Sequence, residues 1–413
     1  MGKSYIYENQ KKLRWGYTTG TCAAAASLAA AVVLLRCESV EQVQIETPKG
    51  ILLDLEIEDM KAERDWVSCA VRKDGGDDPD VTNGFLVYSR VSRENPFKDK
   101  WETRKSGCYE YKNGTLHLFL SGGMGIGRVT KEGLSCEVGK YAINPVPRQM
   151  IFSQVEKVCR QEGFQGSLWI EISVPEGVEA ASRTFNGKLG IEGGISILGT
   201  SGMVEPMSET ALLETIRLEL RQKALEGQSQ VILTPGNYGQ QFIKKAMGLE
   251  LEQAVKCSNF IGATIDMAVE EGVKGLLLIG HGGKLIKVAA GVMNTHSSVA
   301  DGRMEVLAAY AGAWGCKKEL VRRLLSSVTV EDALRQMDAV EGLLEGVMRQ
   351  VTEAVDRHLK GRAGGRIAIE TVIFTNERGI LGMSCGAAGM LKKLRCEKPY
   401  AGMGRISPVG NRF

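Results

Sequence analysis

The chain has 413 residues, more than one hydrophobic core usually serves, so its length predicts at least two domains. Its net charge of +3 comes from basic and acidic residues that are mixed along the chain, which excludes the basic stripe of a nucleic-acid-binding protein. Ten dispersed cysteines, without a CxxC pair or metal-ligand spacing to a histidine, predict reduced thiols and a cytoplasmic location, and they do not require a protein-bound metal.

The first predicted element is an apolar stretch that follows three basic residues and so resembles a leader peptide or a membrane span. Ala23–Leu35 is shorter than the ~20 residues that cross a bilayer, and it begins late in the chain. Thr18–Thr21 precede it and contain good N-capping residues. We therefore predict a buried, Ala-rich helix over residues 22–36 and no association with a membrane.

Residues 1–190 predict an α+β domain. Short apolar segments separated by turn residues predict strands, and Asn144–Pro147 introduces a helix over residues 148–162. The predicted strands cover residues 41–46, 51–57, 66–72, 115–120 and 167–174.

From residue 191 the pattern changes to strands that alternate with helices. This alternation predicts a doubly wound α/β domain with a mostly parallel sheet over residues 191–413. The fold class is therefore mixed α/β with two domains. The predicted strands cover residues 195–198, 230–233, 274–279 and 366–374. The predicted helices cover residues 208–225, 239–247, 259–271, 284–290, 302–314, 317–326, 330–337 and 341–360.

Two polar segments of the N-terminal half are candidate ligand sites. Thr18–Ala26 offers hydroxyls and amides at a helix start, which suit a carboxylate, but helix capping and close packing explain the same pattern. Lys73–Gly84 contains four aspartates, which fit a solvated turn, a hard-cation site, or a catalytic acid or base at Asp77 or Asp78. The glycines of residues 122–127 lack the spacing of a dinucleotide-binding loop.

Two glycine-rich segments of the C-terminal half, Thr234–Gly239 and Gly280–Lys284, each follow a predicted buried strand. Because the carboxyl ends of parallel strands meet at one edge of a sheet, these segments predict a crevice for a polar, anionic small molecule. His296 is a further candidate because its surroundings are polar. A phosphate-handling enzyme is the alternative function, although residues 280–284 lack the Walker pattern. The predicted binding positions are Thr234, Gly236, Asn237, Gly239, Gly280, His281, Gly282 and Gly283.

Several long segments resemble one protein family, the cobalt-precorrin-5B C-1-methyltransferases of anaerobic cobalamin biosynthesis. The resemblance covers nearly the whole chain, and its motifs are long. The matching segments are GYTTGTCAAAA (Gly16–Ala26), KDGGDDPDVTNG (Lys73–Gly84), GIGRVTKEGL (Gly125–Leu134), VGKYAINPVPRQMI (Val138–Ile151), TFNGKLGIEGGISILGTSGMVEPMS (Thr184–Ser208), TPGNYG (Thr234–Gly239) and GKLIKVAAGVMNTHSSVADGRME (Gly283–Glu305).

The resemblance implies transfer of a methyl group from S-adenosylmethionine to C-1 of a cobalt-corrinoid, which gives cobalt-precorrin-6A. It implies that S-adenosylmethionine is the methyl donor, that the partner is a small-molecule corrinoid, and that cobalt arrives inside this substrate. The sequence leaves open whether the protein is a homo-oligomer. A non-catalytic tetrapyrrole carrier is a third alternative.

Methyl transfer to carbon is an in-line displacement that depends mainly on positioning. We expect residues 191–413 to hold S-adenosylmethionine in the predicted crevice and residues 1–190 to face the corrinoid. The acidic arms of the macrocycle need basic side chains, hydroxyls and amides. Proton transfer on the ring is assigned to Asp77, Asp78 or His296. The candidate substrate-binding residues are Thr18, Thr19, Thr21, Arg148, Lys284, Lys287 and Arg303.

Overall fold

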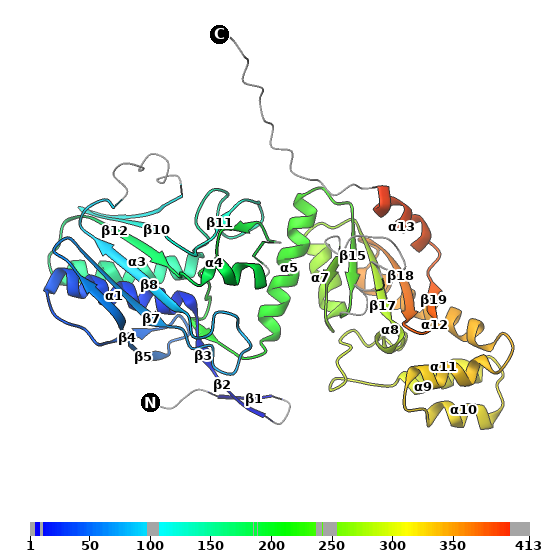
Figure 1. Ribbon diagram of the computed structural model, residues 1–413. Helices are drawn as coiled ribbons and strands as arrows, with labels where there is room; N and C mark the ends of the chain where they lie inside the picture. Colours follow the sequence, from blue (N-terminus) through cyan, green and yellow to red (C-terminus); the bar gives the residue numbers. More distant parts are fainter. Residues whose placement is uncertain are drawn as a thin grey trace, which may run out of the picture. The chain divides into compact units, whose positions relative to one another are not determined.

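The computed structural model divides the chain into two compact units, Met1–Glu209 (unit 1) and Thr210–Phe413 (unit 2), and each is described by itself (Figure 1). The residues described are 5–8, 11–96, 107–184, 186–187, 189–236, 242 and 254–396. Unit 1 mixes short sheets with helices, and unit 2 alternates strands with helices. The predicted class, mixed α/β with an α+β part followed by an α/β part, is confirmed.

Unit 1 is built on a six-stranded sheet in the order β6-β7-β8-β12-β10-β9. Strands β10 and β12 are parallel, with α3 between them in the chain, and the other neighbours in this sheet are antiparallel. The strands of this sheet are β6 (Glu58–Ala62), β7 (Trp66–Arg72), β8 (Leu86–Ser92), β9 (Tyr109–Asn113), β10 (Leu116–Gly122) and β12 (Gly166–Ser173). Two-stranded pairs complete the unit: β1 (Tyr5–Glu8) with β2 (Lys11–Arg14), β3 (Gly16–Tyr17) with β14 (Met203–Val204), β4 (Gln42–Glu46) with β5 (Leu52–Glu56), and β11 (Arg128–Val129) with β13 (Ile191–Glu192).

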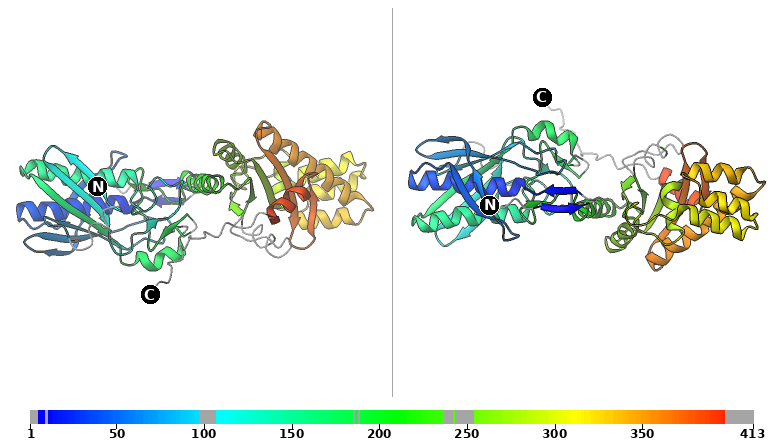
Figure 2. Two further views of the ribbon diagram at one scale, coloured as in Figure 1. Left: turned by 90° about the horizontal axis from the view of Figure 1, so that it is seen from above. Right: turned by 90° about the horizontal axis from the view of Figure 1, so that it is seen from below.

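Helices α1 (Thr19–Arg36) and α3 (Pro145–Gln161) lie side by side against this sheet (Figure 2). By length and composition alone α1 is apolar enough to cross a membrane, but 72% of it is buried inside the unit. Its alanines pack with strand residues such as Val67 and Val91 in one core. The predicted buried, Ala-rich helix is therefore confirmed. A short helix, α4 (Gly177–Ala180), follows β12.

The boundary between the units falls after Glu209, whereas the sequence placed it after residue 190. Residues 191–209 pair with unit 1: β14 lies antiparallel to β3, and Ile195 and Ile197 form isolated bridges to Ile126 and Ile143. The strand predicted over residues 195–198 as the start of the parallel sheet is therefore wrong. Its apolar residues fill the core of unit 1 instead.

Unit 2 contains a five-stranded sheet in the order β16-β15-β17-β18-β19. The first four strands are parallel, and β19 is antiparallel to β18. The strands are β15 (Gln230–Thr234), β16 (Ala254–Lys256), β17 (Gly275–His281), β18 (Ala368–Thr375) and β19 (Gly379–Met383). The helices are α5 (Glu209–Leu225), α7 (Ile261–Glu270), α8 (Gly282–Val288), α9 (Arg303–Ala313), α10 (Lys318–Leu325), α11 (Val330–Asp338), α12 (Leu343–Ala363) and α13 (Ala387–Cys396).

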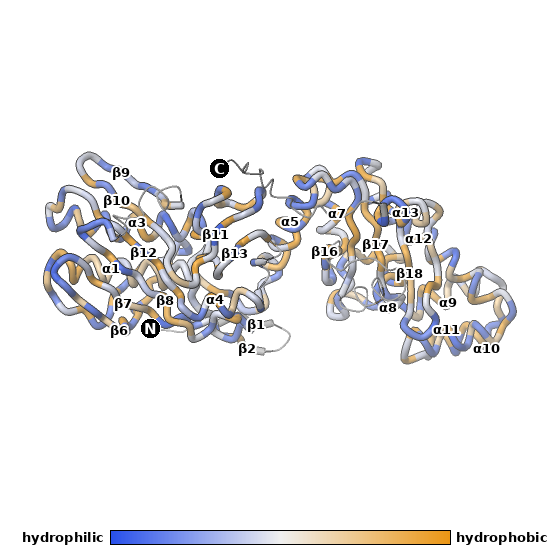
Figure 3. Tube along the Cα trace, turned by 45° about the horizontal axis from the view of Figure 1, so that its top comes forward, coloured by the Kyte–Doolittle hydropathy of each residue, from blue (hydrophilic) through white to orange (hydrophobic). Residues whose placement is uncertain are grey.

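Helices cover both faces of this sheet, as the doubly wound prediction requires. Leu276 and Leu278 of β17 pack toward one core with α7, α8 and α12, whereas Leu277 and Ile279 pack toward the other with α13. Helices α10 and α11 alternate hydrophilic and hydrophobic residues, which leaves one face of each for the core (Figure 3). The sequence missed β16, β19 and α13, and its helix at residues 239–247 lies outside the described residues.

Candidate functional site

Segments that are far apart in the sequence meet at the first turn of α1. The Gly20 amide donates a hydrogen bond to the Leu198 carbonyl at 2.9 Å. The Thr18 amide donates to the Gly202 carbonyl at 3.1 Å. A Cβ atom on Gly20 would lie 2.6 Å from Cγ of Pro147, so only glycine lets these segments approach this closely. The sequence motif at the start of α1 is therefore the meeting point of several loops of unit 1.

The three threonine hydroxyls predicted to bind substrate are all engaged within the protein. Thr18 Oγ1 accepts the amide of Thr21 at 3.2 Å and so caps the helix. The Thr21 hydroxyl donates to the Gly202 carbonyl at 2.7 Å. Thr19 Oγ1 accepts the Leu198 amide at 3.0 Å. This arrangement is that of helix capping and packing, and a ligand would have to displace one of these bonds.

Asp77 and Asp78, the predicted acid-base residues of unit 1, hold two of its loops in place. Asp77 Oδ2 accepts the backbone amide of Arg14 at 2.6 Å, and Asp78 Oδ1 accepts the backbone amide of Met207 at 3.0 Å. Asp77 is exposed and Asp78 is half-buried. These bonds use one oxygen of each carboxylate, so the other oxygen remains on hand for a proton or a ligand.

The neighbouring carboxylates, Asp74 and Asp80, are ion-paired. Hydrogen bonds from the Arg14 guanidinium lower the pKa of Asp74. Burial alone would raise the pKa of Asp80, but the buried Lys73 ammonium at 2.6 Å lowers it. Among the residues that the structure describes, no group of three or more His, Cys, Asp or Glu side chains is placed to hold a metal ion. The aspartate-rich segment is thus a turn of unit 1 that is stabilised by ion pairs.

Two arginines of unit 1 stack on tyrosine rings near the start of α3. The Arg148 guanidinium lies 3.9 Å from the ring centroid of Tyr109, and the Arg128 guanidinium lies 4.6 Å from that of Tyr141. The Lys140 ammonium also lies over Tyr109 and donates to a backbone carbonyl at 2.6 Å. The sequence named only Arg148 of this group. The other basic residues belong to the same family-like segments, and their clustering was the signal that could have found them.

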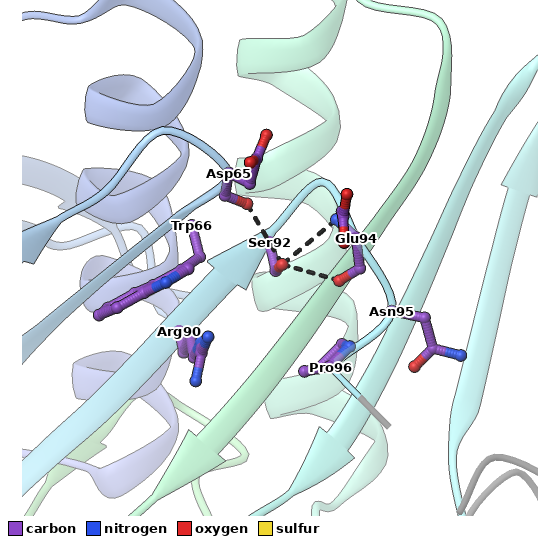
Figure 4. A pocket seen from close by; sticks show the side chains of 7 residues that line it. All are labelled: Asp65, Trp66, Arg90, Ser92, Glu94, Asn95 and Pro96. Carbon is purple, nitrogen blue, oxygen red and sulfur yellow. Dashed lines mark hydrogen bonds between the residues drawn. The ribbon is translucent and has the colours of Figure 1, made fainter. Parts of the chain in front are cut away.

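A pocket opens at one end of β7 and β8 in unit 1 (Figure 4). Its volume is about 390 Å³. The Arg90 guanidinium stacks on Trp66 inside it, and the Ser92 hydroxyl donates to the Glu94 carbonyl at 2.7 Å. Its lining includes one guanidinium and two carboxylates, so the pocket does not favour a polyanion. It is lined by Asp65, Trp66, Arg90, Ser92, Glu94, Asn95 and Pro96.

In unit 2, the predicted glycine-rich loop at residues 280–284 is wrong. Gly280 and His281 belong to β17, and α8 begins directly at Gly282. A Cβ atom on Gly280 would lie 2.7 Å from the Leu285 side chain, so this glycine serves packing. Burial lowers the pKa of His281, and its neutral ring caps α8 by accepting the Gly283 amide at 3.1 Å. The helix start therefore has less free backbone for an anion than the sequence suggested.

The described part of the first glycine segment, Thr234–Gly236, lies near Lys284 at the carboxyl edge of the sheet. The chain runs from β15 to β16 on one side and then to β17 on the other, which makes the carboxyl ends of β15 and β17 a topological switch point. A Cβ atom on Gly236 would lie 3.5 Å from Nζ of Lys284, which fills the space between the segments. The Thr234 side chain is fully buried. Asn237 and Gly239 lie outside the described residues.

Lys284 is the central cation of this edge. Its ammonium donates to Asn259 Oδ1 at 2.7 Å and to the Ser258 carbonyl at 3.3 Å. Burial lowers the pKa of Lys284, and the neighbouring ammonium groups of Lys256 and Lys287 add to this effect. A carboxylate that bound here would offset both causes.

The remaining predicted residues of unit 2 gather around the loop after α8. The Lys287 ammonium is buried and donates to the carbonyls of Thr295 and Ala300 at 3.2 and 2.9 Å. His296 is exposed, and its Nδ1 lies 2.6 Å from the Ser298 hydroxyl. Arg303 forms a double hydrogen bond with Asp301, and this holds the pKa of Asp301 at about 2. Lys287 and Arg303 thus have partners within the protein, whereas His296 is open to solvent.

Comparisons with known proteins support the same family along nearly the whole chain. The family model described as CbiD matches residues 6–206, and the model of the CbiD C-terminal domain matches residues 294–385. The chain is 45% identical to a cobalt-precorrin-5B C(1)-methyltransferase of Ruminiclostridium cellulolyticum, with 95% of this chain and 98% of that protein covered. It belongs to this family. A relative of the same name from Alkaliphilus metalliredigens is 44% identical, with 95% of this chain and 98% of that protein covered.

A crystal structure of a cobalamin biosynthesis protein (cbiD) from Archaeoglobus fulgidus is 29% identical in sequence. It covers 72% of this chain and 87% of its own, with a TM-score of 0.36. The CbiD match over residues 6–206 contains the start of α1, the aspartate turn and the stacked arginines. The C-terminal match contains His296 and Arg303, while Lys284 lies between the two matched ranges.

Membership of the CbiD family favours methyl transfer over the phosphate-handling alternative, which no finding supports. The geometry of α8 agrees, because the Gly283 amide already bonds to His281. The chain is therefore an enzyme of the methyltransferase class in cobalamin biosynthesis, and such an enzyme needs a methyl donor.

Proposed function

We propose that this protein transfers a methyl group from S-adenosylmethionine to C-1 of cobalt-precorrin-5B, which gives cobalt-precorrin-6A and S-adenosylhomocysteine. The observation that carries the proposal is the 45% identity, over 95% of the chain, to a cobalt-precorrin-5B C(1)-methyltransferase. Cobalt belongs to the substrate and is not a resident metal of the enzyme.

In the proposed step the methyl carbon leaves sulfur without its bonding electrons. The electron pair of the S–CH₃ bond stays on sulfur, which becomes neutral, and the conjugated macrocycle supplies the pair for the new bond at C-1. The ring takes up the positive charge, and loss of a proton neutralises it. Alignment of the two reactants and exclusion of water contribute most to such a displacement.

We infer that S-adenosylmethionine binds at the carboxyl edge of the unit 2 sheet. Ligands of doubly wound proteins bind at such a switch point, and Lys284 supplies a cation for the carboxylate of the methionine part. The carboxylate would replace Asn259 as the main partner of the ammonium. Asp77, Asp78 and His296 remain the candidates for the proton transfer, because none of them is fully buried and each bears a group that can accept a proton.

The test is an anaerobic incubation of the purified protein with cobalt-precorrin-5B and S-adenosylmethionine labelled with ¹³C in the methyl group. We expect one labelled methyl group on the corrinoid, located at C-1 by NMR, and one equivalent of S-adenosylhomocysteine. A corrinoid that is bound but never methylated would identify a carrier instead. A product labelled at another carbon would also contradict the proposal.

The cofactor location is tested by Lys284→Gln, which removes the charge but retains a polar group. We expect the KM for S-adenosylmethionine to rise about tenfold, the usual effect of losing one charge-assisted hydrogen bond. Lys274→Gln is the matched control. Lys274 is exposed and directly precedes β17, at the end of that strand opposite to Lys284. Equal KM values for the two variants would move the cofactor away from this edge.

A further inference from the structure

Arg128 and Arg148 differ from most partly buried arginines of the chain. Arg14, Arg36 and Arg303 each form an ion pair with a carboxylate. In the part of unit 1 that the structure describes, neither Arg128 nor Arg148 has a carboxylate within ion-pair distance. Burying guanidinium donors without an acceptor costs free energy, so their lack of partners asks for an explanation.

The Arg148 side chain is the clearer case. Its Nε is buried without a hydrogen-bond partner, and its guanidinium has no acceptor among the described residues. The guanidinium of Arg128 makes one bond, to the Tyr141 hydroxyl at 3.3 Å, which leaves most of its donors unused. Most N–H donors of these two guanidinium groups therefore have no hydrogen-bond acceptor among the described residues.

The position of Arg148 is electrostatically unfavourable in the protein alone. It lies in the first turn of α3, where the helix dipole favours an anion and not a cation. The Lys140 ammonium, over the same Tyr109 ring, adds a like charge. A bound anion would relieve all of these costs together.

The tyrosine rings fix the geometry of this cluster. Tyr109 is buried, and its hydroxyl donates to the Tyr141 carbonyl at 2.7 Å, so the Tyr109 ring is held against the segment that contains Tyr141. Burial raises the pKa of Tyr109, which therefore stays neutral and does not neutralise the arginines. Each guanidinium lies over a tyrosine ring, which holds the cation in place without using its N–H groups as hydrogen-bond donors to that ring. A planar guanidinium with unused donors can bind a carboxylate through two hydrogen bonds.

We propose that Arg128, Lys140 and Arg148 form a subsite that binds the carboxylate arms of the corrinoid. This inference rests on the proposed function, since the substrate of that reaction carries acetate and propionate arms. Within the described part of unit 1, these three cations have no carboxylate partner, which matches a ligand with several carboxylates. The pocket at Trp66 suits it less well, because Asp65 and Glu94 would repel the arms.

The test compares two corrinoids that share the macrocycle and differ in their arms: dicyanocobyrinic acid, with carboxylate arms, and dicyanocobinamide, with amide arms. Affinities for the full chain are measured by calorimetry. We expect wild-type protein to bind the acid at least tenfold more tightly, with a preference that falls as salt rises. Arg148→Gln and Arg128→Gln should each weaken binding of the acid about tenfold and leave cobinamide unchanged.

Arg160→Gln is the matched control, because Arg160 is exposed in the last turn of the same helix. It should bind both corrinoids as wild type does. Arg148→Lys should recover part of the affinity, since it keeps the charge and loses the planar fork. S-adenosylhomocysteine serves as a third probe, and its affinity should be the same in wild type and in Arg148→Gln.

A second measurement needs no variant and so does not depend on correct folding of a mutant. Phenylglyoxal modifies accessible guanidinium groups, and mass spectrometry locates the modified peptides. Dicyanocobyrinic acid should protect Arg128 and Arg148 but not Arg160, and dicyanocobinamide should protect none of them. Equal protection by both corrinoids, unchanged affinity in both variants, or selective loss of S-adenosylhomocysteine binding would overturn the subsite. Methyl transfer by the wild-type enzyme would persist in those cases, whereas its absence would count against the proposed function.

Discussion

The two units hold their candidate-site segments together in different ways. In unit 2 the ammonium groups of Lys284 and Lys287 donate to oxygens of Asn259 and of the loop that follows α8. In unit 1 the segments join through backbone hydrogen bonds around small residues such as Gly20. The guanidinium groups of Arg128 and Arg148 take almost no part in that network.

This difference separates cations whose donors bond to acceptors of the protein from cations whose donors are largely unused among the described residues. Lys287 and Arg303 belong to a family-like segment and were predicted to bind substrate, but each has its acceptors within the protein. Arg148 was predicted on the same grounds and has none among the described residues. The sequence identifies the charged side chains, and only the fold shows whether the protein itself supplies their hydrogen-bond acceptors.

The largest expected effect comes from removing the buried cation of unit 2. Lys287→Met keeps most of the side-chain volume but leaves the carbonyls of Thr295 and Ala300 without their donor. We expect unfolding free energy to fall by about 3 kcal/mol, measured by urea denaturation. Hydrogen exchange should accelerate first in the loop at residues 294–302.

Arg303→Gln is the comparison for that variant, because its ion pair with Asp301 is solvent-exposed. Exposed ion pairs contribute little, so it should lower stability by less than about 1 kcal/mol. If the two variants lose the same unfolding free energy, the buried ammonium group of Lys287 contributes no more to stability than the exposed ion pair of Arg303.

The next effect tests the small-residue contacts of unit 1. In Gly20→Ala the new methyl group would lie 2.6 Å from Cγ of Pro147 and 2.8 Å from the Leu198 carbonyl. Overpacking of this kind typically costs about 2 kcal/mol, so the urea midpoint should fall, with faster hydrogen exchange at residues 198–202. Gly187→Ala, where a Cβ meets open space, should leave both measurements unchanged. A stable Gly20→Ala protein would mean that these segments can separate without loss.

The hydrophobic pattern predicted the long elements well, because burial in a helix repeats every three to four residues and a buried strand is a continuous apolar run. The helix predicted over residues 302–314 is α9 (Arg303–Ala313), and the strand predicted over 366–374 is β18 (Ala368–Thr375). It missed β16 because three residues are too few to show a period. It missed the correct boundary because residues 191–209 are short apolar pieces that could belong to either unit.

The candidate site was predictable by segment but not by side chain. The stacked group joins residues of β9, β11 and α3 with the loop before α3, and no local pattern indicates that these elements meet. Arg148 was found through its motif, whereas Tyr109 lies outside every family-like segment. The predicted loop at residues 280–284 failed because glycines suggest a turn, although Gly280 is there to accommodate Leu285.

The smallest expected effect concerns pH and the second lysine of unit 2. Because burial lowers the pKa of Lys284 in the folded protein, the unfolded chain binds more protons at alkaline pH, and stability rises with pH through that window. The rise should begin below the ordinary lysine pKa of about 10.4 and end above it. Lys284 is only half-buried, so the gain in stability should stay well under about 1 kcal/mol.

Lys284→Met should flatten the rise in stability, seen in urea midpoints between about pH 8 and 10.5. Lys274→Met, which changes an exposed lysine, should retain this rise. If the urea midpoints of the two variants change with pH in the same way, the pKa of Lys284 is the same in the folded and the unfolded chain, and burial of its ammonium group does not affect stability.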